Sequence, residues 1–314
     1  MPKGRSPRKG SLQFWPRKRA AKFLPSTNWD AILNTDKSLK GFIAYKAGMF
    51  SVLVKDDTEH SMTKGKKKPI PATILECPPM KIFSVRFYKY GKVATEILAE
   101  GLEKELKRKV KLPKETKKFD SIKTEDYEDV RLIVYSIVKK TNLKKKPDMI
   151  EIGLNGSYEE KLDYIKENLG KEISVMDVFE NGELADMRGL TKGKGFSGPV
   201  KRFGIQLKNQ KSEKGRRRPG SIGPWHPARV IFRVPMAGQL GMFSRVVYNS
   251  KILGIGKAED KFKNIKNYGD VKTDYIIVQG SVQGSAKRQL VLTKALRPTR
   301  KQSKKKYGLL EVLK

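Results

Sequence analysis

The sequence has very few of the residues that cross-link small proteins or bind metals. One cysteine, Cys77, and two histidines, His60 and His226, occur in 314 residues. A single cysteine excludes an internal disulfide, and no Cys/His cluster has the composition of a zinc site. We therefore predict no metal, no cofactor and a reducing cytosol as the compartment.

Long apolar runs are also missing. The best stretch, VRLIVYSIV at residues 130–138, contains Arg131 and is too short to span a bilayer. The N-terminus has no apolar signal core. A membrane partner is therefore not expected.

Acidic residues are scarce relative to basic ones. The chain has 33 Asp and Glu against 68 Lys and Arg, a net charge of +35. Such an excess repels itself unless a polyanion neutralises it, and nucleic acid is the expected partner. The excess is uneven, because residues 96–183 hold 20 acids and 18 basic residues and are nearly neutral. This segment is typical of an ordinary globular insertion with a solvated surface.

Ile, Val, Phe and Tyr in short runs broken by Gly and Pro predict β-strands for most of the chain. The basic TKGKKKP at residues 63–69 is expected at a hairpin tip. The short strands and the Gly-rich turns between them favour an antiparallel barrel built from segments that are distant in the sequence. The predicted strands are 41–54, short strands within 70–91, and 173–179, 182–190, 241–256, 274–282 and 288–296.

The near-neutral segment changes to a helical period. Residues 95–110 and 157–172 are predicted helices, the second with Leu162 and Ile165 on its apolar face and Gly170 as its end. Two strand-like runs, 131–138 and 149–154, lie between them. We therefore predict a mainly β fold with an α/β insertion.

The predicted domain organisation follows these changes in composition. It consists of a basic N-terminal extension (1–38), the first part of the barrel (39–100), the α/β insertion (101–170), the middle part of the barrel (171–190), a basic loop with a Trp tip that is expected to thread into a folded nucleic acid (191–239), the last part of the barrel (240–296) and a basic C-terminal tail (297–314).

The N-terminal extension is unsuited to folding by itself. Its first 25 residues have eight basic residues and no acid, with Phe14 and Trp15 followed by Pro16. It is expected either to order along phosphates with its aromatic residues on bases or in a groove, or to remain a mobile tail.

A G-x-G-x-x-G pattern occurs at Gly193, Gly195 and Gly198. A dinucleotide site needs a helix that opens at the last glycine, but Pro199 follows it and no helical apolar period comes next. The catalytic motifs of protein kinases and a P-loop are absent from the sequence. We therefore predict phosphate contacts by the lysines between the glycines, on a backbone that can approach closely.

The segment RRRPGSIGPWHPARV at residues 216–230 places Trp225 and His226 between two prolines. The prolines exclude a helix interior and a central strand, so a rigid loop is predicted. Trp225 is either a core residue or a contact for nucleic acid, stacked on a base or wedged in a crevice. His226 is a ligand, a general base or a packing residue, with catalysis the least favoured of the three.

Several stretches together resemble the family of universal ribosomal protein L three of the large subunit, in its archaeal form. Their order and spacing match over essentially the whole chain. They are GFIAYKAGM (41–49), LTKGKGFSGPVKRFG (190–204), RRRPGSIGPWHPARV (216–230), MAGQLG (236–241) and VQGSVQGSAKR (278–288).

The resemblance implies a non-enzymatic ribosomal constituent in the cytoplasm, with a translation-protein-type β-barrel. It implies early assembly, binding to the 3′-terminal domains of large-subunit ribosomal RNA (rRNA), and protein neighbours that include universal L fourteen. A loop led by Trp225 would approach the peptidyl transferase centre. Eukaryotic relatives have a histidine where this chain has Glu213, so a role tied to that histidine is not expected here.

The residues predicted to contact rRNA are basic or aromatic and lie mainly in the extension and the loop. They are Lys3, Arg5, Arg8, Lys9, Arg17, Lys18, Arg19, Lys192, Lys194, Lys201, Arg202, Lys211, Lys214, Arg216, Arg217, Arg218, Trp225, His226, Arg229, Arg233, Lys287 and Arg288. A nucleotide-dependent enzyme and a free RNA or DNA chaperone are the rival hypotheses, and no small-molecule substrate is predicted.

Overall fold

The computed structural model describes residues 9–32, 39–113, 127–211, 214–258 and 262–313. The chain divides into two compact units. We call residues 1–22 and 190–244 the basic unit, and residues 23–189 and 245–314 the β unit. Each is described by itself.

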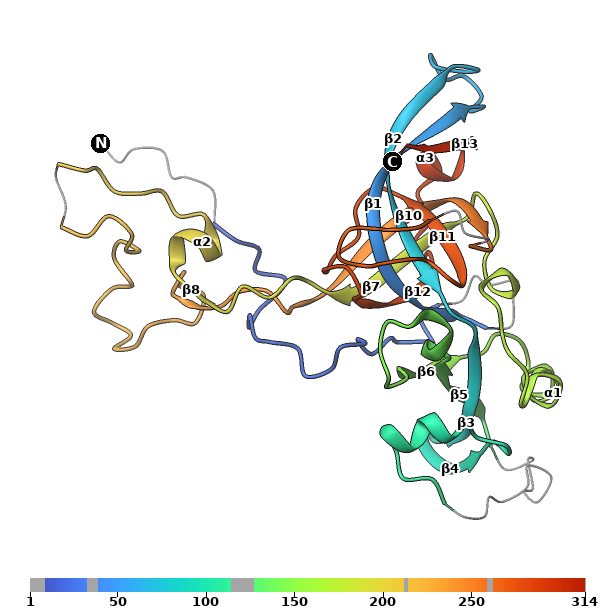
Figure 1. Ribbon diagram of the computed structural model, residues 1–314. Coiled ribbons are helices and arrows are strands. Elements are labelled where there is room, and N and C mark those ends of the chain that lie inside the picture. The colour runs from blue at the N-terminus through green and yellow to red at the C-terminus, as the bar shows by residue number, and fades with distance from the viewer. Residues whose placement is uncertain (1–8, 33–38, 114–126, 212–213, 259–261, 314) are drawn as a thin grey trace. The chain divides into compact units, whose positions relative to one another are not determined.

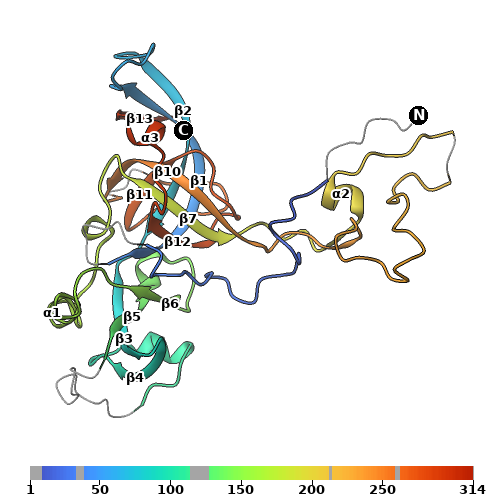
Figure 2. The same ribbon diagram turned by 180° about the vertical axis from the view of Figure 1, so that it is seen from behind.

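A seven-stranded sheet organises the β unit. Its order is β12-β7-β10-β11-β2-β1-β13, and β12 pairs with β1 as well as with β7. Figure 2 shows β7 and β10 side by side. The strands are β1 (Gly41–Asp56), β2 (Lys67–Cys77), β7 (Leu184–Leu190), β10 (Ser244–Gly256), β11 (Asp274–Gln279), β12 (Gln289–Lys294) and β13 (Tyr307–Leu313).

Strand β1 connects the two ends of this strand order. Its residues 41–45 pair antiparallel with β12, its residues 51–56 pair with β13, and residues 45–55 pair with β2. The residues from Gly41 to Ala47 are buried in succession, whereas burial alternates further along. Phe42, Ile43 and Tyr45 are fully buried, as expected where a strand has covered faces on both sides.

A second, four-stranded antiparallel sheet has the order β4-β3-β5-β6. The chain enters it from β2 through Pro78 and Pro79, which cannot donate to a ladder and so separate the two strands. Figure 1 shows β2 continuing into β3 across this point. The strands are β3 (Met80–Lys89), β4 (Lys92–Leu98), β5 (Asp129–Ser136) and β6 (Met149–Gly153).

Helix α1 (Tyr158–Asn168) packs on β5 and confirms the predicted helix within 157–172. The Ser157 side chain accepts from the Glu160 N–H, and the Glu160 carboxylate accepts from the Ser157 N–H. This capping box satisfies two backbone donors at the helix start. Leu162 and Ile165 are buried, as the apolar period predicts.

Two predicted elements are wrong. Residues 95–98 complete β4, paired with β3, and only a short 3₁₀ helix, η1 (Lys104–Arg108), follows them. Residues 173–179 were predicted as a strand but form 3₁₀ helix η5 (Val175–Asp177), because Ser174 and Asp177 make a capping box. In both cases a local tertiary partner or cap outweighs the periodicity of a short segment.

The segment boundaries also differ from those expected. Strands β3 and β4 belong to the four-stranded sheet, although residues 39–100 were assigned to the barrel. Residues 297–314 were expected as a basic tail, but they contain helix α3 (Arg300–Ser303) and β13, which pairs with β1. The apolar residues of β13 form a strand at the edge of the sheet. The lysines that precede them led to the prediction of a basic tail. Among the described residues a further 3₁₀ helix is η4 (Val138–Thr141).

Candidate nucleic-acid interface

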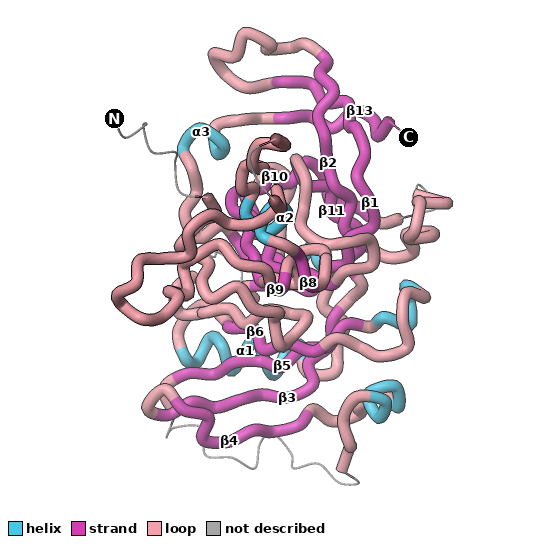
Figure 3. Tube along the Cα trace, turned by 90° about the vertical axis from the view of Figure 1, so that its left-hand side faces the viewer, coloured by secondary structure: helices cyan, strands magenta, loops and turns pink. Residues whose placement is uncertain are grey.

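The basic unit is extreme in charge. By sequence it contains twenty Lys and Arg residues and a single acid, Glu213. Its cations therefore cannot be neutralised within the unit. Its short elements are β8 (Phe196–Ser197), α2 (Pro199–Phe203) and β9 (Gly238–Gln239), and Figure 3 shows β8 beside β9.

A two-stranded ribbon positions the lysines of the glycine motif. The Lys194 N–H donates to the Leu240 carbonyl and the Leu240 N–H donates to the Gly195 carbonyl, each over 2.9 Å. Gly241 closes the ribbon at a φ of +78°, and a Cβ there would lie 1.9 Å from the Lys192 carbonyl oxygen. Only glycine fits that approach. Lys192 and Lys194 are both exposed on the ribbon.

The sequence prediction that no helix follows the glycines is wrong. Helix α2 begins at Pro199, directly after Gly198, and ends at Gly204 in the left-handed conformation. Proline at the first position and glycine after the last are the residues that favour these ends. The helix has five residues, and the strand β8 lies inside the glycine pattern rather than before it. The arrangement therefore still lacks the strand–turn–helix order of a dinucleotide site.

Arg202 and Arg17 clasp the N-terminal extension to the loop. The Arg202 guanidinium donates to the carbonyls of Gln239 (3.0 Å), Met236 (3.0 Å) and Arg17 (3.2 Å). Arg17 in turn donates to the Arg202 carbonyl over 3.2 Å. Burial lowers the pKa of Arg202, and the adjacent Arg17 charge lowers it further. These two arginines, predicted as phosphate ligands, thus hold the protein backbone, and their contact with RNA stays a prediction.

Aromatic rings fill the space around this clasp. Trp15 stacks on Phe203 with centroids 5.7 Å apart and meets Phe232 edge-on at 5.9 Å. The Arg17 guanidinium lies 4.4 Å from the centroid of Phe203. Such contacts stabilise a packed cluster. Residues 9–22 therefore pack on the loop, which explains how a stretch unsuited to folding alone acquires a conformation.

We expect Arg202→Lys to loosen this clasp. A lysine keeps the charge but cannot direct a planar fork at three carbonyls. Loss of about 1.4 kcal/mol in charged hydrogen bonds would raise the open population about tenfold. The measurement is the rate of tryptic cleavage after Arg17, Lys18 and Arg19, with Lys201→Gln as the exposed neighbouring control. Equal cleavage rates for wild type and R202K would contradict the clasp.

Beyond α2, one pair of residues closes the most basic turn. The Lys208 N–H donates to the Arg216 carbonyl, and Arg216 Nε donates to the Lys208 carbonyl, both over 3.2 Å. Gly215 precedes Arg216 with a φ of +79°. Arg217 and Arg218 are exposed. The pairing therefore holds a loop that presents cations to solvent.

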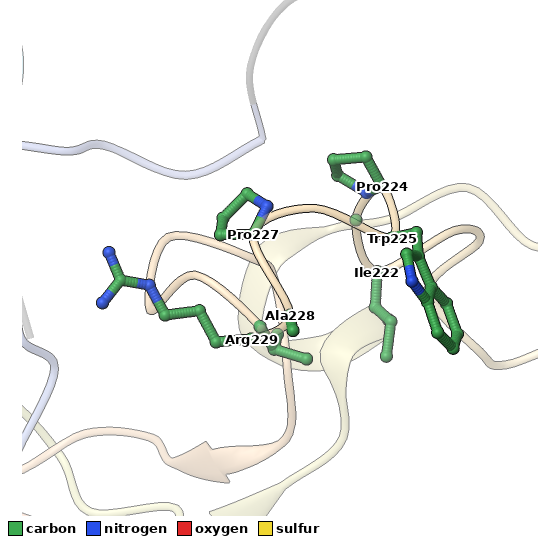
Figure 4. A pocket seen from close by; sticks show the side chains of 8 residues that line it. Ile222, Pro224, Trp225, Pro227, Ala228 and Arg229 are labelled. Atoms are coloured by element: carbon green, nitrogen blue, oxygen red, sulfur yellow. The ribbon is translucent and has the colours of Figure 1, made fainter.

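Trp225 stands in an exposed turn. Its side chain is 86% exposed, which excludes the core alternative in this structure. Residues 222–225 and 227–230 line an open hollow of about 350 Å³. Figure 4 shows the indole on one side of this hollow beside Ile222, with Pro224 and Pro227 along the same turn. His226 is also exposed, so it is not a packing residue.

The other predicted contact residues divide by location. Arg233 lies with its guanidinium 5.9 Å from the Phe232 centroid. In the β unit, Lys287 is exposed, whereas Arg288 is half-buried over Phe23 at 5.1 Å and burial lowers its pKa. Lys3, Arg5 and Arg8 lie outside the described residues. The exposed remainder comprises Lys9, Lys18, Arg19, Lys201, Lys211, Lys214 and Arg229.

Sequence reasoning missed Phe196, whose side chain is 82% exposed on β8. The sequence could have indicated this exposure, because Phe196 lies between glycines in a segment with too few apolar residues to bury it. Across the described ranges no group of His, Cys, Asp or Glu could hold a metal ion. None of the helices described there is long and apolar enough to cross a membrane.

Comparisons with known proteins place this geometry in context. The family model for ribosomal protein L3 matches residues 1–311. Large ribosomal subunit protein uL3 of Methanocaldococcus jannaschii is 44% identical over 312 residues, which cover 93% of this chain and 92% of that protein. The uL3 proteins of Methanococcus vannielii and Archaeoglobus fulgidus are 44% and 40% identical, covering 98% and 93% of this chain and 95% and 92% of their own lengths.

Proposed function

We propose that this chain, which belongs to the ribosomal protein L3 family, is a structural constituent that clamps large-subunit rRNA with its basic unit. The chain is a ribosomal protein of the cytoplasmic large subunit and not an enzyme, so the nucleotide-dependent enzyme hypothesis is discarded. The observation that carries the RNA proposal is the charge of the basic unit, with twenty cations against one acid. A polyanion is the partner expected for such a surface.

The proposed mechanism is electrostatic clamping. Each phosphate that meets a lysine or arginine releases condensed counterions, so many modest contacts sum to tight binding that weakens steeply with salt. The ribbon presents Lys192 and Lys194, and the turn closed by Lys208 and Arg216 presents Arg217 and Arg218. The clasped backbone keeps these cations in place, which lowers the ordering cost of binding.

We also propose that the seven-stranded sheet is a barrel of the translation-protein type. Support comes from the pairing of β12 with both β7 and β1, which joins the two ends of a six-strand run and leaves β13 as an extra strand on β1. Closing a sheet in this way removes exposed edges. The four-stranded sheet and α1 would be the insertion, starting at β3 rather than near residue 101.

The finer placement rests on the family resemblance. We propose that Trp225 leads the loop towards the peptidyl transferase centre, stacked on a base or wedged in a crevice, and that the exposed cations bind the 3′-terminal rRNA domains. Early assembly and a contact with universal L fourteen belong to the same proposal. An exposed Trp225 in a proline-bracketed turn supports it, because an indole held away from the core is available for stacking.

The test is sedimentation of a cell lysate on a sucrose gradient after a high-salt wash, with detection of the protein in each fraction. We expect it to remain equimolar with the large subunit. Recovery at the top of the gradient as free protein would contradict a structural role and favour the free RNA or DNA chaperone.

A further inference from the structure

Phe196 is exposed in a way that the β8–β9 ribbon does not require. Its ring is 82% exposed, more than the 66% of Phe232 in the aromatic cluster. Among the residues that the structure describes, no ring stacks on Phe196 and no cation lies over it. A phenylalanine left in water gives up the free energy that burial of a large ring provides. A binding partner would recover it.

The backbone that carries the ring is held in position. The Phe196 backbone pairs with Gln239, and the neighbouring Ser197 hydroxyl donates to the Lys194 carbonyl over 3.3 Å. The hydrogen bonds between Lys194, Gly195 and Leu240 hold the residues just before it. Because the backbone is set before binding, little backbone conformational entropy remains to be lost when a flat partner covers the ring.

The surroundings identify the chemistry of that partner. Lys192, Lys194 and Lys201 are exposed within five residues of Phe196 along the chain. The described part of the basic unit contains no acidic residue. A partner that offers a flat apolar face together with negative charge is a nucleobase with its flanking phosphates. An apolar patch on a protein would offer these lysines no negative charge.

We propose that Phe196 stacks on an unpaired nucleobase of large-subunit rRNA, while Lys192 and Lys194 contact the adjoining phosphates. This inference rests on the proposed rRNA-binding function and adds a stacking site to it. Base stacking has little dependence on salt, whereas phosphate contacts depend on it strongly. The two contributions can therefore be measured separately.

The experiment measures the affinity of the full-length protein for large-subunit rRNA transcript across a series of salt concentrations. Phe196→Leu removes the π face but keeps an exposed apolar side chain, and Phe196→Trp restores the π face. We expect F196L to bind roughly 5- to 150-fold more weakly, as loss of one stacked base predicts, with an unchanged slope of log K against log salt, and F196W to bind as wild type does. Lys194→Gln should instead reduce the slope by about 0.7 to 0.9.

Tyr90→Leu is the matched control, because Tyr90 is 80% exposed at the turn between β3 and β4 and belongs to the β unit. Chemical probing of the complex should show one unpaired base that wild type and F196W protect and F196L does not. Affinity and protection unchanged in F196L, with F196L folded by its melting temperature, would overturn the stacking site, as would protection confined to phosphates. Failure of wild-type protein to bind the transcript at all would instead refute the proposed function.

Discussion

Deletion of residues 209–219 is expected to leave the β unit folded and to reduce the yield of large subunits several-fold. The deletion removes five basic residues and one acid from the basic unit, and no strand or helix of the β unit. If all five contact phosphates, the slope of log K against log salt for rRNA should fall by roughly 3.5 to 4.5, because each lost phosphate contact lowers it by about 0.7 to 0.9. Gradient profiles of cells carrying the variant measure the yield.

Two replacements of equal length separate charge from shape in this experiment. An uncharged Gly/Ser segment should reproduce the assembly defect, and a Gly/Ser segment with five lysines should restore much of the yield, because the counterion contribution depends on charge more than on sequence. Normal yield from the uncharged segment would refute the electrostatic clamp. The melting temperature of the free protein reports separately on the β unit.

Replacement of Glu76 by alanine is expected to destabilise the β unit by about 3–5 kcal/mol. Glu76 is fully buried, and its carboxylate accepts from the Tyr268 hydroxyl, the Lys272 N–H (2.7 Å) and both the N–H (3.1 Å) and hydroxyl (3.2 Å) of Thr273. Burial raises the pKa of Glu76, although these donors favour its ionised form. Alanine would leave the hydroxyl of the buried Tyr268 and the part-buried donors of Lys272 and Thr273 without this acceptor, which is costly.

Thermal unfolding measures this prediction. For a unit of this size the loss corresponds to a melting temperature lower by roughly 10 °C. Glu76→Gln retains one acceptor oxygen and should lose less, while Glu311→Ala, exposed on β13, should stay within about 0.5 kcal/mol of wild type. An E76A protein as stable as E311A would show that the buried carboxylate does not stabilise the contact between β2 and the residues just before β11.

The secondary-structure elements that could be predicted from the sequence were those with a strong local pattern of apolar and terminating residues. Helix α1 was predictable because its apolar period and the terminating Gly170 agree, and the Ser157 capping box adds to its start. Residues 95–98 and 173–179 were mispredicted because short segments have ambiguous periods, which pairing with β3 and the Ser174 capping box resolved. The exposed cations of the loop were predictable from composition, since a segment rich in Lys, Arg and Gly has no way to bury them.

The sequence by itself determined the charge of the basic unit, the β class of the fold and the family. These depend on composition, on periodicity and on motifs, which are all local properties of the chain. The tertiary structure decided which cations remain available. Arg202 and Arg17 turn inward to carbonyls whereas Arg217 and Arg218 stay exposed, and Trp225 and Phe196 lie exposed while Trp15 packs on Phe203. The physical reason is that exposure depends on partners far away in the sequence, such as Arg17 for Arg202.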